Sequence, residues 1–188
     1  CLPALNNADA LATARMEEAI ALRDAGFARR IIVLSGVVGP DEIAACANHN
    51  LEPVLHSVDA VATMTQNKFD KPVNVWLKID TGMHRLGIQP TDYRNAVSLL
   101  RQHKGVASVQ LMTHFASADE PANPFTQAQA KIFFEITAHE RFDKSLANSA
   151  AILTNVHTHA DWVRPGIMLY GLDPLPKPTD ISAKLRPV

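Results

Sequence analysis

The stretch VWLKIDTGMHRLG, residues 75–87, begins as a buried β-strand and ends in a turn rich in charged side chains. In the longer segment 73–80 the odd-numbered positions are all apolar, and alternate side chains of a strand point to opposite faces. We therefore predict that the odd positions pack against helices, while Trp76, Lys78 and Asp80 point into the interior. A lysine there has to be paired, neutral or chemically modified, because an isolated buried charge is costly.

Strand-like and helix-like segments alternate along the rest of the chain. The predicted strands are 8–14, 30–36, 52–57, 73–80 and 106–116, with strand-then-turn units at 145–151 and 162–171. The predicted helices are 15–26, 40–50, 58–67, 90–103 and 125–140. This alternation predicts an α/β fold with a parallel sheet, either doubly wound or a barrel. No Gly-x-Gly-x-x-Gly motif follows the first strands, so we favour a (β/α)8 TIM-like barrel, truncated and lacking its first strand.

The composition is ordinary for a globular protein, with 47% apolar and 20% charged residues among 188 and a net charge of −1. It offers no case for binding nucleic acid or a membrane. Cys1 and Cys46 make neither a disulfide framework nor a metal motif, and we predict a cytoplasmic location. The chain lacks an initiator Met and closes with a Pro-rich run at 175–188. We predict that 1–188 is one partial barrel domain, a fragment of a longer protein.

Polar side chains collect where the predicted strands end. In a parallel barrel these ends converge on the face that carries active sites. The residues concerned are Lys78, Asp80, Thr113, His114, Asn148, Ser149 and Arg164. Several have structural alternatives: an ion pair for Lys78, a hydrogen-bonded core position for His114, and a helix N-cap for Asn148 and Ser149. A surface turn is likewise the alternative for Arg85.

The last strand end carries a potential anion site. Arg164 precedes Pro165, and a guanidinium suits a planar acceptor or an anion. The backbone N–H groups of Gly166 and Ile167 are suited to cradling a phosphate. The HTHA run at 157–160 offers two histidines without a third ligand nearby, so we predict no metal site.

Four segments resemble, in order and spacing, the barrel domain of bacterial alanine racemases. They are KIDTGMHRLGI (78–88), MTHFASADEP (112–121), LANSAAIL (146–153) and DWVRPGIMLYGL (161–172). The segment at 8–26 is also similar to that family, so the resemblance spans almost the whole chain. It implies a (β/α)8 barrel that binds pyridoxal 5'-phosphate at the strand C-termini.

By this resemblance, five residues bind the cofactor. Arg164 resembles the arginine that hydrogen-bonds the pyridine nitrogen and, being always charged, keeps that nitrogen unprotonated. Ser149, Gly166 and Ile167 resemble the phosphate contacts of the barrel, and Asn148 resembles a neighbouring polar contact.

Three further residues are implied in catalysis. His114 resembles the histidine beside the cofactor. Arg85 resembles the arginine near the phenolic oxygen of the cofactor and the substrate carboxylate. Lys78 matches a lysine that is often carbamylated in this family, and its carbamate would pair with Arg85.

The sequence also departs from the family. The Lys-Ala-Asn-x-Tyr-Gly-like run that anchors the cofactor is absent, as is the β-rich domain whose tyrosine reaches the partner subunit. We therefore expect this chain alone to be inactive. The full-length protein is expected to be a homodimeric alanine racemase that interconverts L- and D-alanine for peptidoglycan precursors. The alternatives are a broad-specificity or serine racemase of the same fold, and a non-catalytic barrel that binds pyridoxal phosphate.

Overall fold

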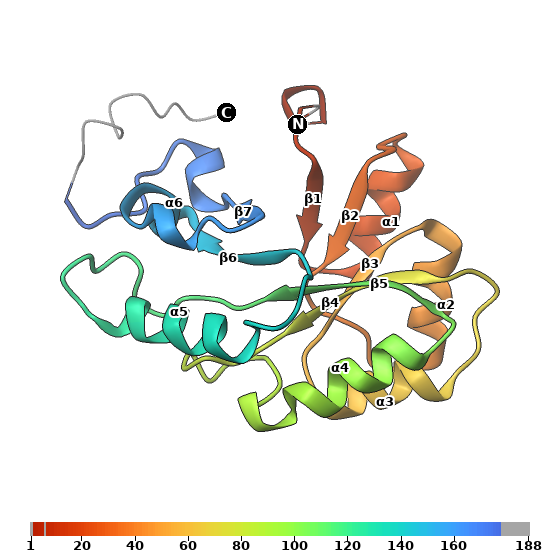
Figure 1. Ribbon diagram of the computed structural model, residues 1–188. Helices are drawn as coiled ribbons and strands as arrows, with labels where there is room; N and C mark the ends of the chain where they lie inside the picture. The colour runs from red at the N-terminus through yellow and green to blue at the C-terminus, as the bar shows by residue number, and fades with distance from the viewer. Residues whose placement is uncertain (1, 6, 178–188) are drawn as a thin grey trace. The chain divides into compact units, whose positions relative to one another are not determined.

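The computed structural model describes residues 2–5 and 7–177, in which strands and helices alternate (Figure 1). The strands are β1 (Ala10–Thr13), β2 (Arg30–Val33), β3 (Glu52–Leu55), β4 (Val73–Lys78), β5 (Val106–Met112), β6 (Lys144–Asn148) and β7 (Trp162–Arg164). The α-helices are α1 (Met16–Asp24), α2 (Pro40–His49), α3 (Val58–Gln66), α4 (Tyr93–Gln102), α5 (Phe125–Ile136) and α6 (Ser149–Thr154). The predicted alternation is confirmed.

The strands form a sheet in chain order, from β1 to β7. The pairs β1–β2, β2–β3, β3–β4, β5–β6 and β6–β7 are parallel, as predicted. The chain divides into two compact units. Unit 1 comprises Cys1–Lys78 and Thr91–Gln110, and unit 2 comprises Ile79–Pro90 and Leu111–Val188.

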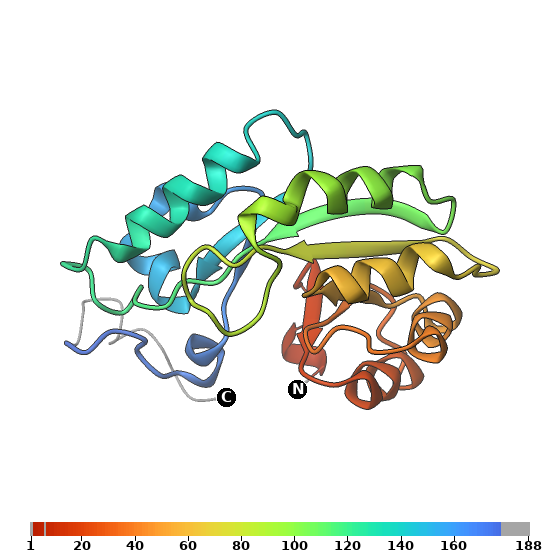
Figure 2. The ribbon, with the colours of Figure 1, turned by 90° about the horizontal axis from the view of Figure 1, so that it is seen from below.

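Unit 1 contains β1 to β4, most of β5 and the helices α1 to α4. The helix α1 contacts β1 and β2, α2 contacts β3, and α3 lies beside α4 (Figure 2). The helix α4 shows why the sequence pattern is reliable here. It has a buried apolar stripe, because residues three and four apart share one face of a helix. The stripe consists of Tyr93, Ala96, Val97 and Leu100.

Local signals fix where the helices of unit 1 begin and end. The helix α2 begins at Pro40, whose fixed φ suits the first helical position. It ends at His49, and the next residue, Asn50, adopts the left-handed conformation with φ of 51°. The helix α3 begins after Ser57, whose Oγ accepts a hydrogen bond from the backbone N–H of Ala60 at 3.0 Å.

A buried carboxylate links three strands of unit 1. Glu52, 3% exposed, accepts two hydrogen bonds from Arg30, at 2.6 and 2.7 Å. Trp76 donates to the same carboxylate through Nε1 at 2.8 Å, and the Arg30 guanidinium lies 5.7 Å from the centre of the Trp76 ring. Asn74 adds a longer contact at 3.4 Å. The carboxylate is therefore fully paired, as a buried charge requires.

Unit 2 contains the end of β5 followed by α5, β6, α6 and β7. Several boundaries differ from the prediction, among them the end of α5, which comes at Ile136 and not at 140. The strand predicted over 106–116 ends at Met112. The turn predicted after β6 is the helix α6, because the Asn148 side chain accepts a hydrogen bond from the Ala151 N–H at 3.1 Å and caps it. The structure thus shows the N-cap alternative for Asn148, whereas Ser149 is the first residue of α6.

Within the described residues, no helix combines the length and apolar character that crossing a membrane requires. The predicted cytoplasmic location stays a prediction. Cys1 and the end of the Pro-rich run lie outside the described residues. Cys46 is buried, and burial, followed by the charge of Glu42, raises the pKa of its thiol to about 12.

Candidate active site

Arg164, at the end of β7, is the best-connected charged side chain at the strand ends of unit 2. Its Nη1 donates to Ser145 Oγ at 2.6 Å, and its Nη2 donates to the carbonyl oxygens of Thr113 at 2.6 Å and Leu146 at 3.2 Å. His114 Nδ1 lies 3.4 Å from the same Nη2. None of these described contacts is to a carboxylate, and none uses Nε. Arg164 is thus held in place with donor capacity left over.

Burial lowers the pKa of Arg164 to about 10. That value still lies well above neutral pH, so the guanidinium keeps its proton and its charge. A charge that is held by carbonyl and hydroxyl oxygens, without an acid among its described partners, suits a ligand that brings an acceptor of its own.

His114 and the loop after β5 are braced by a buried glutamine. Gln129, in α5, is fully buried, and its Nε2 donates to the His114 carbonyl at 3.1 Å and to Thr81 Oγ1 at 3.3 Å. Its Oε1 accepts from the Ala116 N–H at 3.0 Å. This one amide therefore bonds three backbone and hydroxyl groups and holds the backbone at His114 in place.

Ser149 lies against the start of the segment that follows β7, next to Gly166, while Ile167 is exposed. The Gly166 N–H donates to Ser149 Oγ at 2.8 Å, and the Met168 N–H lies 3.5 Å from the same oxygen. A Cβ on Gly166 would stand 3.9 Å from Ser149 Oγ, which is an ordinary van der Waals distance. A hydroxyl with neighbouring backbone N–H groups is a donor set that fits a phosphate.

Asp80 organises the turn that carries Arg85. Its Oδ1 accepts from the backbone N–H groups of Gly82 at 2.9 Å and His84 at 3.1 Å, and its Oδ2 lies 3.1 Å from His84 Nδ1. Burial raises the pKa of Asp80, but these hydrogen bonds outweigh that effect and hold the pKa below 3.8. Arg85 itself is exposed. Its surface-turn alternative therefore fits this structure, and its role at a site stays a prediction.

Lys78 ends β4 in unit 1 and is 8% exposed, as the alternation predicts. Arg85 belongs to unit 2, so the pairing of the two side chains also stays a prediction. Next to β4 in the sheet, His56 follows β3 with its Nε2 2.7 Å from the Leu34 carbonyl. Burial lowers the pKa of His56 below 6.5, and the charge of Lys78 lowers it further. Hydrogen bonds to the Leu34 and Ser35 backbones act in the opposite direction and raise it, but they do not outweigh the burial.

Sequence reasoning missed the side chains that hold the site in shape, above all Ser145, Gln129 and His56. Ser145 lies in the predicted strand, but its contact with Arg164 bridges two strands and could not be predicted. Gln129 and His56 gave no signal either, because nothing in a helical glutamine or a lone histidine marks the partner it will meet.

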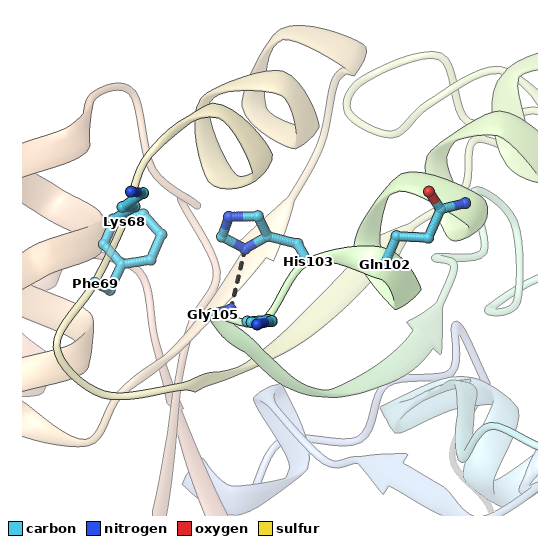
Figure 3. A pocket seen from close by; sticks show the side chains of 6 residues that line it. Lys68, Phe69, Gln102, His103 and Gly105 are labelled. Atoms are coloured by element: carbon cyan, nitrogen blue, oxygen red, sulfur yellow. Dashed lines mark hydrogen bonds between the residues drawn. The ribbon is translucent and has the colours of Figure 1, made fainter.

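A pocket of about 420 Å³ lies in unit 1, beside the starts of β4 and β5. Figure 3 shows its lining, including His103, whose Nδ1 accepts a hydrogen bond from the Gly105 N–H at 3.2 Å. It contains none of the predicted site residues. Across the described residues no group of three potential metal ligands occurs. In the HTHA run, His157 is exposed and His159 Nε2 lies 3.0 Å from the Ile152 carbonyl.

Known proteins are similar to this chain both in sequence and in fold. The model of the family "Alanine racemase, N-terminal domain" matches residues 1–174. An alanine racemase of Shewanella loihica is 43% identical over 172 residues, which cover 91% of this chain and 48% of the relative. The chain thus spans about half the length of the curated relatives it matches.

Solved structures agree. The biosynthetic alanine racemase of Pseudomonas aeruginosa matches with a TM-score of 0.93 at 40% identity, over 100% of this chain and 52% of that one. An alanine racemase of Bartonella henselae, solved with covalently bound pyridoxal phosphate, matches with a TM-score of 0.82 at 27% identity, over 94% and 53%. The predicted fold class, a (β/α)8 barrel of which this chain supplies part, is confirmed. On these grounds, the chain belongs to the alanine racemase family and carries its N-terminal domain.

Proposed function

We propose that the protein to which this chain belongs is an alanine racemase that depends on pyridoxal 5'-phosphate and interconverts L- and D-alanine for peptidoglycan precursors. Family membership over residues 1–174 supports the activity. The observation that carries the proposal is the set of Arg164 contacts. They fix a half-buried cation at a strand end while leaving its Nε without a described partner.

The donor sets of unit 2 fit this cofactor. Ser149 Oγ and the N–H groups of Gly166 and Ile167 would hold its phosphate, since a hydroxyl and adjacent backbone donors suit that group. Arg164 would face the ring nitrogen, with His114 and Asn148 beside it. When bound, pyridoxal phosphate acts as an electron sink that makes the α-proton of an attached amino acid acidic.

Arg164 would act as a hydrogen-bond donor and would retain its proton. With a pKa of about 10, it remains charged at the pH at which a ring nitrogen would accept from it. It would therefore donate to that nitrogen and leave it unprotonated. An unprotonated ring draws electrons less strongly than a protonated one. This favours racemisation over the side reactions, such as transamination, that a protonated ring would promote.

The remaining site residues would bind substrate and complete the active site. Arg85 would bind the alanine carboxylate, and Lys78, as an anionic carbamate, would orient Arg85. We place the two acid–base groups, a lysine and a tyrosine, in other parts of the protein, the tyrosine in a β-rich domain of the partner subunit. The protein would thus work as a homodimer, with residues 1–188 as part of its cofactor-binding barrel.

The test is to express the intact gene product that contains this chain and to follow the conversion of L-alanine and L-serine to their D-forms. We expect D-alanine to form, with cofactor absorbance in the purified protein. Faster conversion of serine would favour the serine racemase alternative. Cofactor-loaded protein that converts neither would contradict the proposal and leave the non-catalytic barrel. Lys131→Met, on an exposed helical pair with Glu135, serves as the unaffected control.

A further inference from the structure

His56 is anchored tightly at the C-terminal end of β3. Its Nε2 lies 2.7 Å from the carbonyl oxygen of Leu34, and a carbonyl can only accept, so Nε2 carries the proton. The ring also packs against Gly36, where an added Cβ would lie 2.9 Å from His56 Cδ2 and 2.3 Å from the Val54 carbonyl. A side chain at Gly36 would therefore displace the imidazole.

The other ring nitrogen is an unused acceptor. Because burial lowers the pKa of His56 below 6.5, the ring is neutral near physiological pH, and a proton on Nε2 leaves a lone pair on Nδ1. Nδ1 is buried and accepts no hydrogen bond from any described residue. Buried polar atoms of this kind are uncommon, and each one calls for a donor that is present in the working protein.

The sheet register points to the donor. In the β3–β4 pair, Val54 lies opposite Trp76 and Leu55 opposite Leu77. Continuing the register by one residue places His56 opposite Lys78, and side chains at matching positions of neighbouring strands share a face. Lys78 is close enough for its charge to act on the His56 ring, and it is itself 8% exposed.

We propose that His56 is a positioning residue for Lys78, whose Nζ donates a hydrogen bond to His56 Nδ1 in the working enzyme and is thereby fixed at the strand end. The ammonium, the neutral amine and a carbamylated lysine each keep at least one N–H, so all three forms can make this contact. The proposal rests on the proposed function insofar as Lys78 belongs to the active site. Its hydrogen bond is measurable whether or not the protein racemises alanine.

Two substitutions distinguish the bond from His56 Nε2 to Leu34 from the proposed bond between Lys78 and His56 Nδ1. His56→Gln keeps a donor where Nε2 bonds Leu34 but removes the acceptor at Nδ1. His56→Asn sets its side-chain oxygen near the place of Nδ1 and gives up the bond to Leu34. In the intact protein we expect kcat/KM for L-alanine to fall about tenfold in His56→Gln and to stay within about threefold of wild type in His56→Asn. His159→Gln, on a histidine with the same kind of carbonyl bond, should change nothing.

The reverse ranking, with Asn worse than Gln, would show that only the anchor matters and would overturn the proposal. An independent readout is the ¹⁵N NMR signal of His56 Nδ1 in the intact protein labelled with ¹⁵N-histidine, assigned with His56→Gln. We expect the Nδ1 signal to lie at a hydrogen-bonded position in wild type and to move toward that of a free acceptor in Lys78→Met. An Nδ1 signal that is the same in both proteins would overturn the proposal.

Discussion

The Glu52 cluster of unit 1 and the Arg164 cluster of unit 2 each surround a charged group, fully buried in Glu52 and half-buried in Arg164, but the partners of the two charges differ. Glu52 meets a cation of opposite sign through two short hydrogen bonds and is capped by Trp76 Nε1. Arg164 meets only carbonyl, hydroxyl and imidazole groups among the described residues. A charge that is fully matched stabilises the fold, whereas a charge held without its counterpart suits a ligand.

Removing the carboxylate charge should have the largest effect on stability. Glu52→Gln leaves the Arg30 guanidinium with an amide in place of a charge, and we expect the free energy of unfolding of the intact protein to fall by about 3 kcal/mol. Urea denaturation measures this. Glu135→Gln, on an exposed helical pair, should stay within about 0.5 kcal/mol of wild type. Equal losses in the two variants would mean that the Glu52 cluster is no more important than a surface ion pair.

Arg164→Lys should lower activity and leave stability nearly unchanged, in contrast to Glu52→Gln. The ammonium keeps the charge but cannot reach Ser145, Thr113 and an outside acceptor at once, because it lacks the planar fork of arginine. We expect kcat for alanine racemisation to fall by about a hundredfold, while the urea midpoint stays near that of wild type. A variant with wild-type kcat and a much lower urea midpoint would mean that Arg164 stabilises the fold, as Glu52 does. The proposed difference between the two clusters would then be wrong.

A smaller effect concerns pH and the Asp80 turn. The folded pKa of Asp80 lies below 3.8, so its stabilisation is present above pH 3.8 and is lost as pH falls through the folded pKa. We expect the free energy of unfolding to fall more steeply between pH 5 and 3 in wild type than in Asp80→Asn, by about 1 kcal/mol in total. Asp119→Asn, at an exposed position, is the control. Parallel pH profiles for wild type and Asp80→Asn would contradict this.

The sequence predicts features that depend on local spacing, and it does not predict contacts between residues far apart in the chain. The period of two along 73–80 predicted a buried Lys78 and Asp80, because strand geometry alone decides which face a residue takes. Polar strand ends likewise led to Ser149, Gly166 and Arg164. The residues that hold His114 and Arg164 in place were missed: Gln129 lies 15 positions from His114, and Ser145 lies 19 from Arg164. Contacts across such separations follow from the packed fold and leave no local spacing to read.

For Asn148, the sequence alone does not distinguish a helix cap from a cofactor contact. Asn148 was open to two interpretations, a cofactor contact or an N-cap, and the structure shows the cap. A capping side chain can still contact a ligand through its second polar atom, so the role proposed for Asn148 at the cofactor remains to be tested. Lys78 and Arg85, which the sequence sets seven positions apart, fall in different units, and their pairing stays a prediction.

The most direct test of the account is the protonation state of the ring nitrogen that Arg164 is proposed to face. The measurement is the ¹⁵N NMR shift of the pyridine nitrogen in the intact protein loaded with ¹⁵N-labelled pyridoxal phosphate, for wild type and Arg164→Lys at neutral pH. We predict an unprotonated, hydrogen-bonded nitrogen in wild type and a changed shift in the variant. A protonated nitrogen in wild type, or a shift that ignores the substitution, would contradict the role given to Arg164.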